Sequence, residues 1–373
     1  MIIVPNIPLE EFEIPAGGMG SALGIVNDYV GSLDFGVVGS GQCGGRLAKS
    51  FYEAGYKKAM AINTTLLDLN PLEIPENQKL KIGSLDGSGK DMVKGAKAAE
   101  ESAQSILDKM KTVFGQVDKI ILCVGLGGGT GAGSCPVLID IARKYLAFLG
   151  NPNPNKNVVI VAALPTDGEL RSAVTKNNND KAQKMIFGIA DQGEVGPVIL
   201  IDNSKIEKLY RGIPPTKFWP TVNDTITGLF QIFNYLSQQE STFTSFDKED
   251  YKTVLGTSGL AVLGVTKVEF KEGTELSQAL QDNLKKTLLA DMVDYATAKE
   301  ASCVVVVGSE VLANITMDAI NYGFDSVSNM IDNANVHRGL YETEGNVVRA
   351  YTLVTGMKSK NYTNEQTTAY KNI

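Results

Sequence analysis

A glycine-rich segment follows the apolar run at residues 120–124 and limits the possible folds more than any other stretch of the chain. Residues 125–133 read Gly-Leu-Gly-Gly-Gly-Thr-Gly-Ala-Gly, and a helical pattern begins at residue 134. Glycines let backbone N–H groups approach a ligand, and a run of such groups at a helix N-terminus forms an anion site. A tight turn needs one or two glycines, so the segment predicts a loop that binds a di- or triphosphate.

The composition narrows the class of protein. The 373 residues suffice for one large or two medium domains, and the apolar fraction of 43% supports a substantial core. A formal charge of −7 argues against general binding to nucleic acid or to a membrane surface. The four cysteines lack zinc-ligand spacing and are typical of reduced thiols in the cytoplasm. We expect no signal peptide and no membrane insertion.

His337 is the single histidine of the chain. Histidine metal clusters and a Ser-His-Asp triad therefore have little support. We assign His337 a structural role just before a turn.

Strands and helices alternate in the first half of the chain, which predicts a doubly wound parallel sheet with ligand loops at the strand C-termini. The expected strands are 33–38, 58–63, 119–124, 158–164 and 195–203, and the expected helices are 44–55, 90–114, 134–148 and 221–239. A second unit is expected near residue 246, with strands at 259–265, 302–308 and 349–355 and a helix at 275–297.

This pattern divides the chain into five predicted segments. They are an N-terminal extension at 1–33 with one helix at 21–30, a nucleotide-binding domain at 34–217, a long central helix at 218–240, a smaller α+β domain at 241–357 and a polar tail at 358–373.

Two further glycine loops follow other strands of the predicted sheet. Residues 39–44 match the G-x-G-x-x-G fingerprint of dinucleotide sites. That site needs an acid at the end of the second strand, where this chain has Asn63-Thr64-Thr65, so an NAD-dependent oxidoreductase is the weaker alternative. The loop with Gly87 and Gly89 fails the Walker pattern because Asp91 follows its lysine, which leaves a third phosphate loop or a solvent turn.

The three loops, in this order and on alternating strands, resemble those of the tubulin/FtsZ superfamily. Residues 127–133 are similar to its GGGTG(S/T)G signature, residues 41–44 to the GQCG of tubulins, and residues 61–64 to the AINT of FtsZ proteins. The Asn223-Asp224 pair looks like the pair that opens the central helix of the family. Residues 245–250 are similar to its NxDxxD loop, with serine in place of the asparagine.

The resemblance covers about residues 34–357 and implies a GTPase that binds GTP or GDP with Mg²⁺. Asp224 would read guanine, because a carboxylate can accept hydrogen bonds from both N1–H and the 2-amino group, whereas adenine lacks this donor pair. The alternatives are a helix cap for Asn223 and a half-buried anchor for Trp219, which otherwise stacks on the base. No metal ligand is assigned. The expected nucleotide-binding residues are Gly41, Gln42, Cys43, Gly44, Asn63, Gly87, Gly89, Gly127, Gly128, Gly129, Thr130, Gly131, Glu169, Arg171, Asn203, Trp219, Asn223 and Asp224.

Asp247 and Asp250 are the candidate catalytic residues. Their i, i+3 spacing places both carboxylates on one side of a helical turn. The resemblance implies that they act on GTP held by a neighbouring subunit, so that hydrolysis accompanies assembly. The alternative for the pair is a plain helix start with acids near the dipole.

The expected partner is therefore a further copy of the chain, stacked head to tail in an open filament. We expect neither the C-terminal peptide of FtsZ proteins nor the acidic tail of tubulins, which favours a divergent prokaryotic member resembling plasmid TubZ or phage-encoded tubulins. Such a protein would act in the bacterial host cytoplasm and move plasmid or phage DNA through a DNA-bound adaptor, without binding nucleic acid directly. The sequence is also compatible with a division-type FtsZ and with a non-hydrolysing GTP-binding scaffold.

Overall fold

The computed structural model describes residues 31–209, 212–268, 275–286, 292–331 and 334–360. The helix expected at 21–30 and most of the expected polar tail lie outside these residues. The chain forms two compact units. Of the described residues, the first contains those of 34–186 and 200–231, and the second contains those of 187–199 and of 232–360, with the short segment 31–33.

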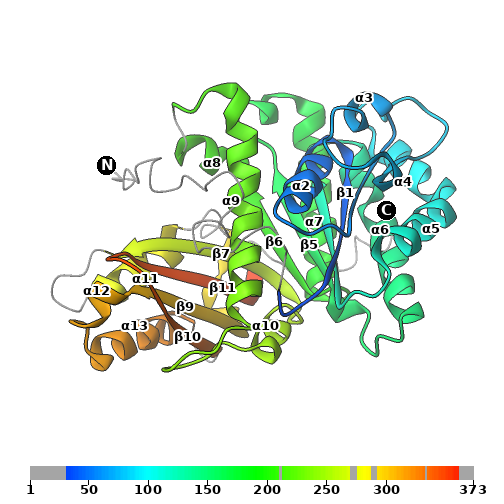
Figure 1. Cartoon of the computed structure of the whole chain (residues 1–373). Coiled ribbons are helices and arrows are strands. Elements are labelled where there is room, and N and C mark those ends of the chain that lie inside the picture. Colours follow the sequence, from blue (N-terminus) through cyan, green and yellow to red (C-terminus); the bar gives the residue numbers. More distant parts are fainter. Residues whose placement is uncertain (1–30, 210–211, 269–274, 287–291, 332–333, 361–373) are drawn as a thin grey trace. The chain divides into compact units, whose positions relative to one another are not determined.

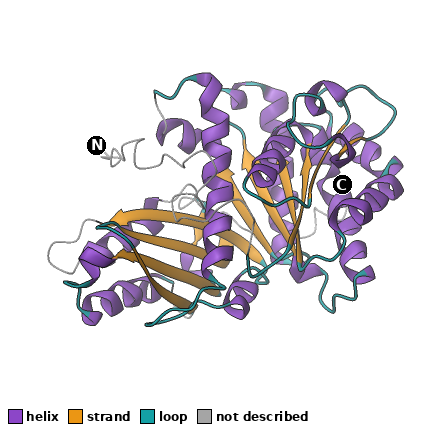
Figure 2. Ribbon diagram, viewed as in Figure 1, coloured by secondary structure: helices purple, strands orange, loops and turns teal. Residues whose placement is uncertain are grey.

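The first unit is built on a parallel sheet with helices packed around it (Figures 1 and 2). Its strands lie in the order β5-β4-β1-β2-β3, and each pairing along this path is parallel. The central strands are buried over almost their whole length, as expected for parallel strands covered on both faces. The strands are β1 (Phe35–Ser40), β2 (Ala59–Asn63), β3 (Lys79–Lys81), β4 (Lys119–Gly125) and β5 (Val158–Leu164).

Helices alternate with these strands along the chain, and further helices follow β5. They are α2 (Gly41–Glu53), α3 (Leu66–Leu69), α4 (Met92–Glu101), α5 (Ala103–Phe114), α6 (Thr130–Phe148), α7 (Ala173–Asp191), α8 (Asn203–Leu209) and α9 (Pro215–Leu236), with 3-10 turns at Glu76–Gln78, Asn155–Asn157 and Glu169–Arg171.

The second unit contains a mixed sheet in the order β10-β9-β11-β7-β6. β10 runs parallel to β9, whereas β11 is antiparallel to both of its neighbours in that order. The strands are β6 (Pro197–Asp202), β7 (Gly259–Val268), β8 (Val293–Asp294), β9 (Glu300–Gly308), β10 (Asn335–Thr343) and β11 (Val348–Ser359). The helices are α10 (Lys248–Val254), α11 (Glu275–Lys286), α12 (Ser309–Leu312) and α13 (Met317–Met330), with a 3-10 turn at Tyr295–Thr297.

The predicted doubly wound parallel sheet is confirmed, and several boundaries need correction. The helix expected at 90–114 is two helices, because the backbone of Ser102 leaves helical geometry and its hydroxyl accepts a hydrogen bond from Gly83 N–H at 2.8 Å. The helix expected at 275–297 is too long, since Val293–Asp294 is a strand. α2 and α6 begin at Gly41 and Thr130, within the glycine segments themselves.

Other elements differ from the sequence-based expectation. α7, α13 and β10 were not predicted, and His337 lies within β10 rather than just before a turn. α9 starts at Pro215, earlier than either expected start of the long helix. β11 extends to Ser359, so the first residues of the expected polar tail belong to a strand.

Candidate nucleotide site and catalytic loop

Three loops of the first unit meet at the hydroxyl of Thr130. Thr130 Oγ1 lies 2.9 Å from Thr64 Oγ1 and donates a hydrogen bond to Ser88 Oγ at 3.1 Å. Thr64 follows β2, Ser88 lies between the glycines of the third loop, and Thr130 begins α6; all three side chains are buried. The structure therefore brings together three segments that the sequence singled out separately.

The helices α2 and α6 begin at the same edge of the sheet. They follow the neighbouring parallel strands β1 and β4, whose ends are paired at Ser40 and Val124. A Cβ on Gly41, which has φ +72°, would lie 3.0 Å from the backbone nitrogen of Gly131. The unpaired first-turn N–H groups of two helices are therefore gathered in one place, which is the geometry that binds phosphate.

The glycines of these loops differ in what a side chain at each position would contact. A Cβ on Gly44 would lie 2.1 Å from the Cys123 carbonyl oxygen, and a Cβ on Gly129 would lie 2.5 Å from Ser88 Oγ. These two glycines permit close packing within the protein. A Cβ on Gly128, in contrast, would have no described atom within 4 Å, so Gly128 faces open space, and its contact with a phosphate stays a prediction.

Gly127, Gly87 and Gly89 also have distinct environments. A Cβ on Gly127 would lie 2.7 Å from Pro165, which is again a packing constraint. Gly87 and Gly89 have φ of +100° and +59°, and no described atom would contact a Cβ at either one. Glycine is favoured there by backbone conformation.

The Asp68 carboxylate lies beside the predicted site, although no sequence motif singled it out. Gln42 Nε2 donates to Asp68 Oδ1 at 3.1 Å, and Asn63 Nδ2 donates to Asp68 Oδ2 at 3.0 Å. The four-residue helix α3, capped by the Thr65 side chain, turns this acid back toward the strand ends. The available signal was the single acid within Leu66–Leu69, just beyond Asn63-Thr64-Thr65, where a dinucleotide site would need an acid.

Glu169 and Arg171 form a 3-10 turn after β5. Glu169 Oε2 accepts from the Thr166 N–H at 2.8 Å, and Thr166 Oγ1 accepts from the Glu169 N–H at 3.2 Å. Arg171 is exposed. Part of the Glu169 carboxylate is thus used locally, and contact of either residue with a nucleotide stays a prediction.

Cys43 lies near the start of α2 and is half-buried. Burial, followed by the negative charge of Glu169, raises the pKa of its thiol to about 11. The thiol is therefore protonated at neutral pH and suits close contact with a phosphate better than a thiolate would.

The residues predicted to read the base lie on α8 and α9. Asn203 and Asn223 are buried, and Trp219 is half-buried with its ring centroid 5.0 Å from that of Phe218. The helix-cap alternative for Asn223 is wrong, because the residue lies well inside α9. The exposure of Trp219 agrees both with stacking on a base and with a half-buried anchor.

Asp224 is a partly buried carboxyl on α9. Burial is the main cause that raises its pKa above the ordinary value of 3.8, with Glu53 adding to the rise, whereas a hydrogen bond with Ser50 opposes it. A desolvated carboxylate interacts strongly with added donors, because few water molecules compete for it. Asp224 is therefore suited to accept the paired N–H donors of guanine.

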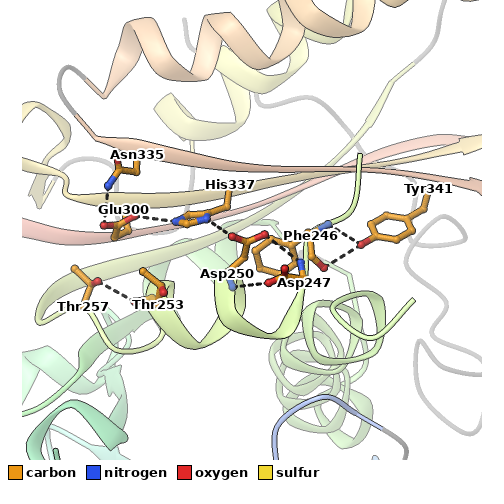
Figure 3. A network of polar contacts seen from close by, with 9 residues as sticks. All are labelled: Phe246, Asp247, Asp250, Thr253, Thr257, Glu300, Asn335, His337 and Tyr341. Atoms are coloured by element: carbon orange, nitrogen blue, oxygen red, sulfur yellow. Dashed lines mark hydrogen bonds and ion pairs between the residues drawn. The ribbon is translucent and has the colours of Figure 1, made fainter. Parts of the chain in front are cut away.

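In the second unit, Asp247 and Asp250 begin α10 with a reciprocal capping box (Figure 3). Asp247 Oδ1 accepts from the Asp250 N–H at 2.9 Å, and Asp250 Oδ2 accepts from the Asp247 N–H at 3.1 Å. Asp247 is exposed, and the Asp250 side chain is 30% exposed. The plain helix start that was the alternative for this pair is present, and it leaves carboxylate surface free for a second task.

His337 contacts this loop, and no sequence motif predicted that contact. Its Nδ1 lies 2.6 Å from Asp250 Oδ1, and its Nε2 lies 2.9 Å from Glu300 Oε2. The only signal was a single histidine among mixed polar and apolar residues, and its partners are 87 and 37 residues away in the chain.

A parallel sheet with glycine loops gathered at its carboxyl edge defines an α/β nucleotide-binding protein. More specifically, residues 35–211 match the sequence model described as Tubulin/FtsZ family, GTPase domain. The chain thus carries a tubulin/FtsZ-family GTPase domain, and the resemblance inferred from its motifs is confirmed.

Two archaeal proteins are among its relatives by sequence. "Cell division protein FtsZ 2" of Methanocaldococcus jannaschii is 28% identical over 354 residues, which is 92% of this chain and 85% of that protein. "Tubulin-like protein CetZ" of Pyrococcus abyssi is 28% identical over 338 residues, which is 86% of this chain and 85% of the relative.

Solved structures of the family share the fold. A GTPγS-form protofilament of TubZ from Bacillus thuringiensis serovar israelensis has a TM-score of 0.74 at 18% identity, covering 93% of this chain and 91% of that one. The GTPγS-bound protofilament of CetZ2 from Haloferax volcanii has a TM-score of 0.70 at 20% identity, covering 91% and 98%. Among the described residues, no helix has the length and apolar character needed to cross a membrane.

Proposed function

We propose that the chain forms GTP-dependent filaments in which subunits stack head to tail and hydrolyse GTP where two of them meet. The observation that carries the proposal is the free carboxylate oxygen of Asp247 in the Asp247–Asp250 capping box. Asp247 is exposed, and its Oδ2 has no hydrogen-bond partner within the described residues. The glycine loops belong to the other compact unit. A neighbouring subunit would then complete the site.

In this proposal the phosphates of GTP lie against the N-termini of α2 and α6, with Gly128 nearest to them. Asp224, with Asn203 and Asn223, reads the guanine edge. Mg²⁺ prefers one or two carboxylates together with phosphate oxygens. The Asp68 carboxylate, held by two amide groups, fits that role and would help to place the ion, whose chemistry is to neutralise phosphate charge.

Exposed apolar side chains close to the loops support a protein–protein contact there. Leu67 follows Thr65 by two residues and is 78% exposed, and Val93, in the first turn of α4, is 77% exposed. Val174, in the first turn of α7, is 52% exposed. Single exposed apolar residues are common, but three on neighbouring segments of one predicted ligand site are characteristic of a surface that is covered on association.

Hydrolysis needs a water molecule held in line with the terminal phosphate, since catalysis of phosphoryl transfer is mostly positioning and electrostatics. Asp250 is fixed by its capping contacts, and Asp247 is the more exposed acid. We propose that the two carboxylates together hold and polarise this water for the GTP of the adjoining subunit.

The cargo that we propose is plasmid or phage DNA held through a DNA-bound adaptor. Its support is the likeness in fold to TubZ, including the "Helical model of TubZ-Bt two-stranded filament", with a TM-score of 0.77. A role in cell division is the second candidate, because relatives by sequence carry the name FtsZ.

Sedimentation with phosphate release measured in parallel tests the main proposal. GTP should give pellets and phosphate, GTPγS should give longer-lived pellets, and ATP, GDP and NAD should give neither. The phosphate rate per subunit should rise with protein concentration. Equal pelleting with ATP, or a rate per subunit that does not change on dilution to monomers, would contradict the proposal.

A further inference from the structure

Strand β10 presents one face to the catalytic loop. His337, Gly339 and Tyr341 alternate along the strand and therefore point to the same side of the sheet. Tyr341 Oη accepts from the Phe246 N–H at 2.9 Å and donates to the Phe246 carbonyl at 3.0 Å. A Cβ on Gly339 would lie 2.9 Å from the Cβ of Phe246. β10 thus fixes the residue just before Asp247.

His337 continues this contact to the second acid (Figure 3). Its imidazole lies between two carboxylates from different elements, Asp250 on α10 and Glu300 on β9. The side chains of His337 and Glu300 are only 18% and 15% exposed. Glu300 is itself held, because Asn335 Nδ2 donates to its Oε1 at 3.0 Å. The contacts form a series that runs from Asn335 through Glu300 and His337 to Asp250.

The number of hydrogen bonds that each group can donate or accept shows how this series of contacts acts on Asp250. Carboxylates can only accept hydrogen bonds, and a neutral imidazole has one N–H, so both contacts are hydrogen bonds when the ring carries both protons. Asp250 Oδ1 is then bound by His337 and Oδ2 by the Asp247 N–H. Because each oxygen of the Asp250 carboxylate accepts a hydrogen bond, the carboxylate cannot rotate, and its exposed part keeps a single orientation.

We propose that His337 is a positioning residue for GTP hydrolysis, which holds the Asp250 carboxylate in the orientation that aligns the attacking water, with Glu300 as its anchor. The inference rests on the proposed catalytic role of Asp250. His337 does not touch the nucleotide in this scheme. It acts through Asp250 and therefore affects the rate of hydrolysis within filaments and leaves GTP binding by the subunit unchanged.

A matched pair of substitutions separates the two contacts of the imidazole. The amide nitrogen of asparagine can occupy a place close to Nδ1, so His337→Asn can keep the donor to Asp250. The amide nitrogen of glutamine reaches the place of Nε2, so His337→Gln can keep Glu300 and lose Asp250. Arg338→Gln is the control for β10, since Arg338 points to the opposite face and pairs with Asp325 at 3.0 Å.

The measurement is phosphate release per sedimented subunit, together with the GTP affinity of dilute protein. We expect His337→Gln to lower the filament rate by ~10- to 100-fold, the effect of misplacing a catalytic group by about 1 Å. GTP affinity should not change, His337→Asn should retain more activity than His337→Gln, and Arg338→Gln should match the wild type. In an Asp250→Ala background, His337→Gln should cause no further loss.

Three outcomes would overturn the inference: a wild-type filament rate for His337→Gln, equal losses for the two variants, or the same fractional loss for His337→Gln when Asp250 is absent. If both His337 variants misfold, Glu300→Ala removes the anchor and should still lower the rate with unchanged GTP affinity; a wild-type rate would refute the role of the anchor. Full activity of Asp250→Ala alone would instead refute the proposed function. An inactive Asp250→Ala with a fully active His337→Gln would refute this inference alone.

Discussion

The hydroxyl oxygens of Thr64 and Thr130 lie 2.9 Å apart, although 66 residues separate them in the chain. Both are buried, and Thr130 also donates to Ser88. This contact joins the segments that follow two strands to the loop that precedes α4, so the three segments are held together at one point. Loops that are already ordered in this way reduce the conformational entropy that the protein loses when it binds a ligand.

Thr130→Val tests this junction. Valine keeps the side-chain shape but removes the hydroxyl, which leaves Thr64 and Ser88 without their shared partner in a buried place. An unsatisfied buried polar group costs about 1–3 kcal/mol, so Tm should fall by several degrees. Thr130→Ser, which keeps the hydroxyl, is the control. If thermal unfolding shows equal stability for Thr130→Val and the wild type, the junction does not hold the site together.

Gly128→Val should abolish nucleotide binding without unfolding the protein. The new side chain would project into space that no described atom fills, which is the space we assign to phosphate. Gly129→Val should also lose binding but should lower Tm, because its Cβ would meet Ser88 Oγ at 2.5 Å and the backbone of Asp91 at 2.6 Å. Titration with a fluorescent GTP analogue, paired with thermal unfolding, separates the two effects. Normal binding by folded Gly128→Val would remove the phosphate assignment.

The parallel core was predictable because its strands are buried on both faces. β1, β4 and β5 are short apolar runs, and such runs are recognised without knowledge of their neighbours. β10 was not predictable in this way, since Asn335–Thr343 mixes exposed, half-buried and buried positions. The burial pattern of β10 follows from its place in the sheet rather than from the strand preference of its own residues.

The site was predictable only in part, for a similar reason. Glycine loops are a local signal, but the sequence does not show which glycine faces a ligand and which permits packing. Gly44 and Gly128 differ because of Cys123, which lies far from Gly44 in the chain. The contacts of Asp250 with His337 and of Asp68 with Gln42 are likewise made by tertiary structure.

Asp224 should make GTP binding sensitive to pH. Burial raises its pKa above the ordinary value of 3.8, and binding of the guanine N–H groups favours the ionised form. GTP affinity should therefore fall as the pH is lowered through this raised pKa, in a range where an ordinary Asp would still be ionised. Asp224→Asn should bind GTP about tenfold more weakly at neutral pH, since a hydrogen bond to a charged group contributes roughly 1.5–3 kcal/mol.

The stability of Asp224→Asn without nucleotide provides a control for this prediction. A carboxyl whose pKa is raised by folding stabilises the folded state fully below its unfolded pKa, and this contribution is lost as the pH rises through the folded value. Asp224→Asn should thus be at least as stable as the wild type at neutral pH in the absence of nucleotide. Isothermal titration between acidic and neutral pH gives the affinities. A pH profile that Asp224→Asn leaves unchanged would show that another group is responsible.

Asp68→Asn should raise the Mg²⁺ concentration needed for GTP hydrolysis. The substitution keeps the size of the side chain and removes the charge that attracts a hard cation. Glu73→Gln, which removes an exposed carboxylate that pairs with Lys49 just beyond α3, is the control for loss of a surface charge. The midpoint of activity titrated against Mg²⁺ at saturating GTP should shift for Asp68→Asn and should stay unchanged for Glu73→Gln. Identical midpoints for Asp68→Asn and the wild type would exclude Asp68 from the metal site.

Mixing two inactive variants should restore part of the GTPase activity. Asp250→Ala keeps the glycine loops but lacks a catalytic acid, whereas Gly128→Val keeps both acids but holds no nucleotide. If the site is shared between stacked subunits, GTP on the first variant is hydrolysed where a subunit of the second adjoins it. The rate should be greatest near equal amounts and should disappear on dilution below the assembly concentration. Co-sedimentation of a tagged Gly128→Val subunit with Asp250→Ala filaments confirms that mixed contacts form. Co-sedimentation without any recovered phosphate release would mean that both parts of the site act within one subunit.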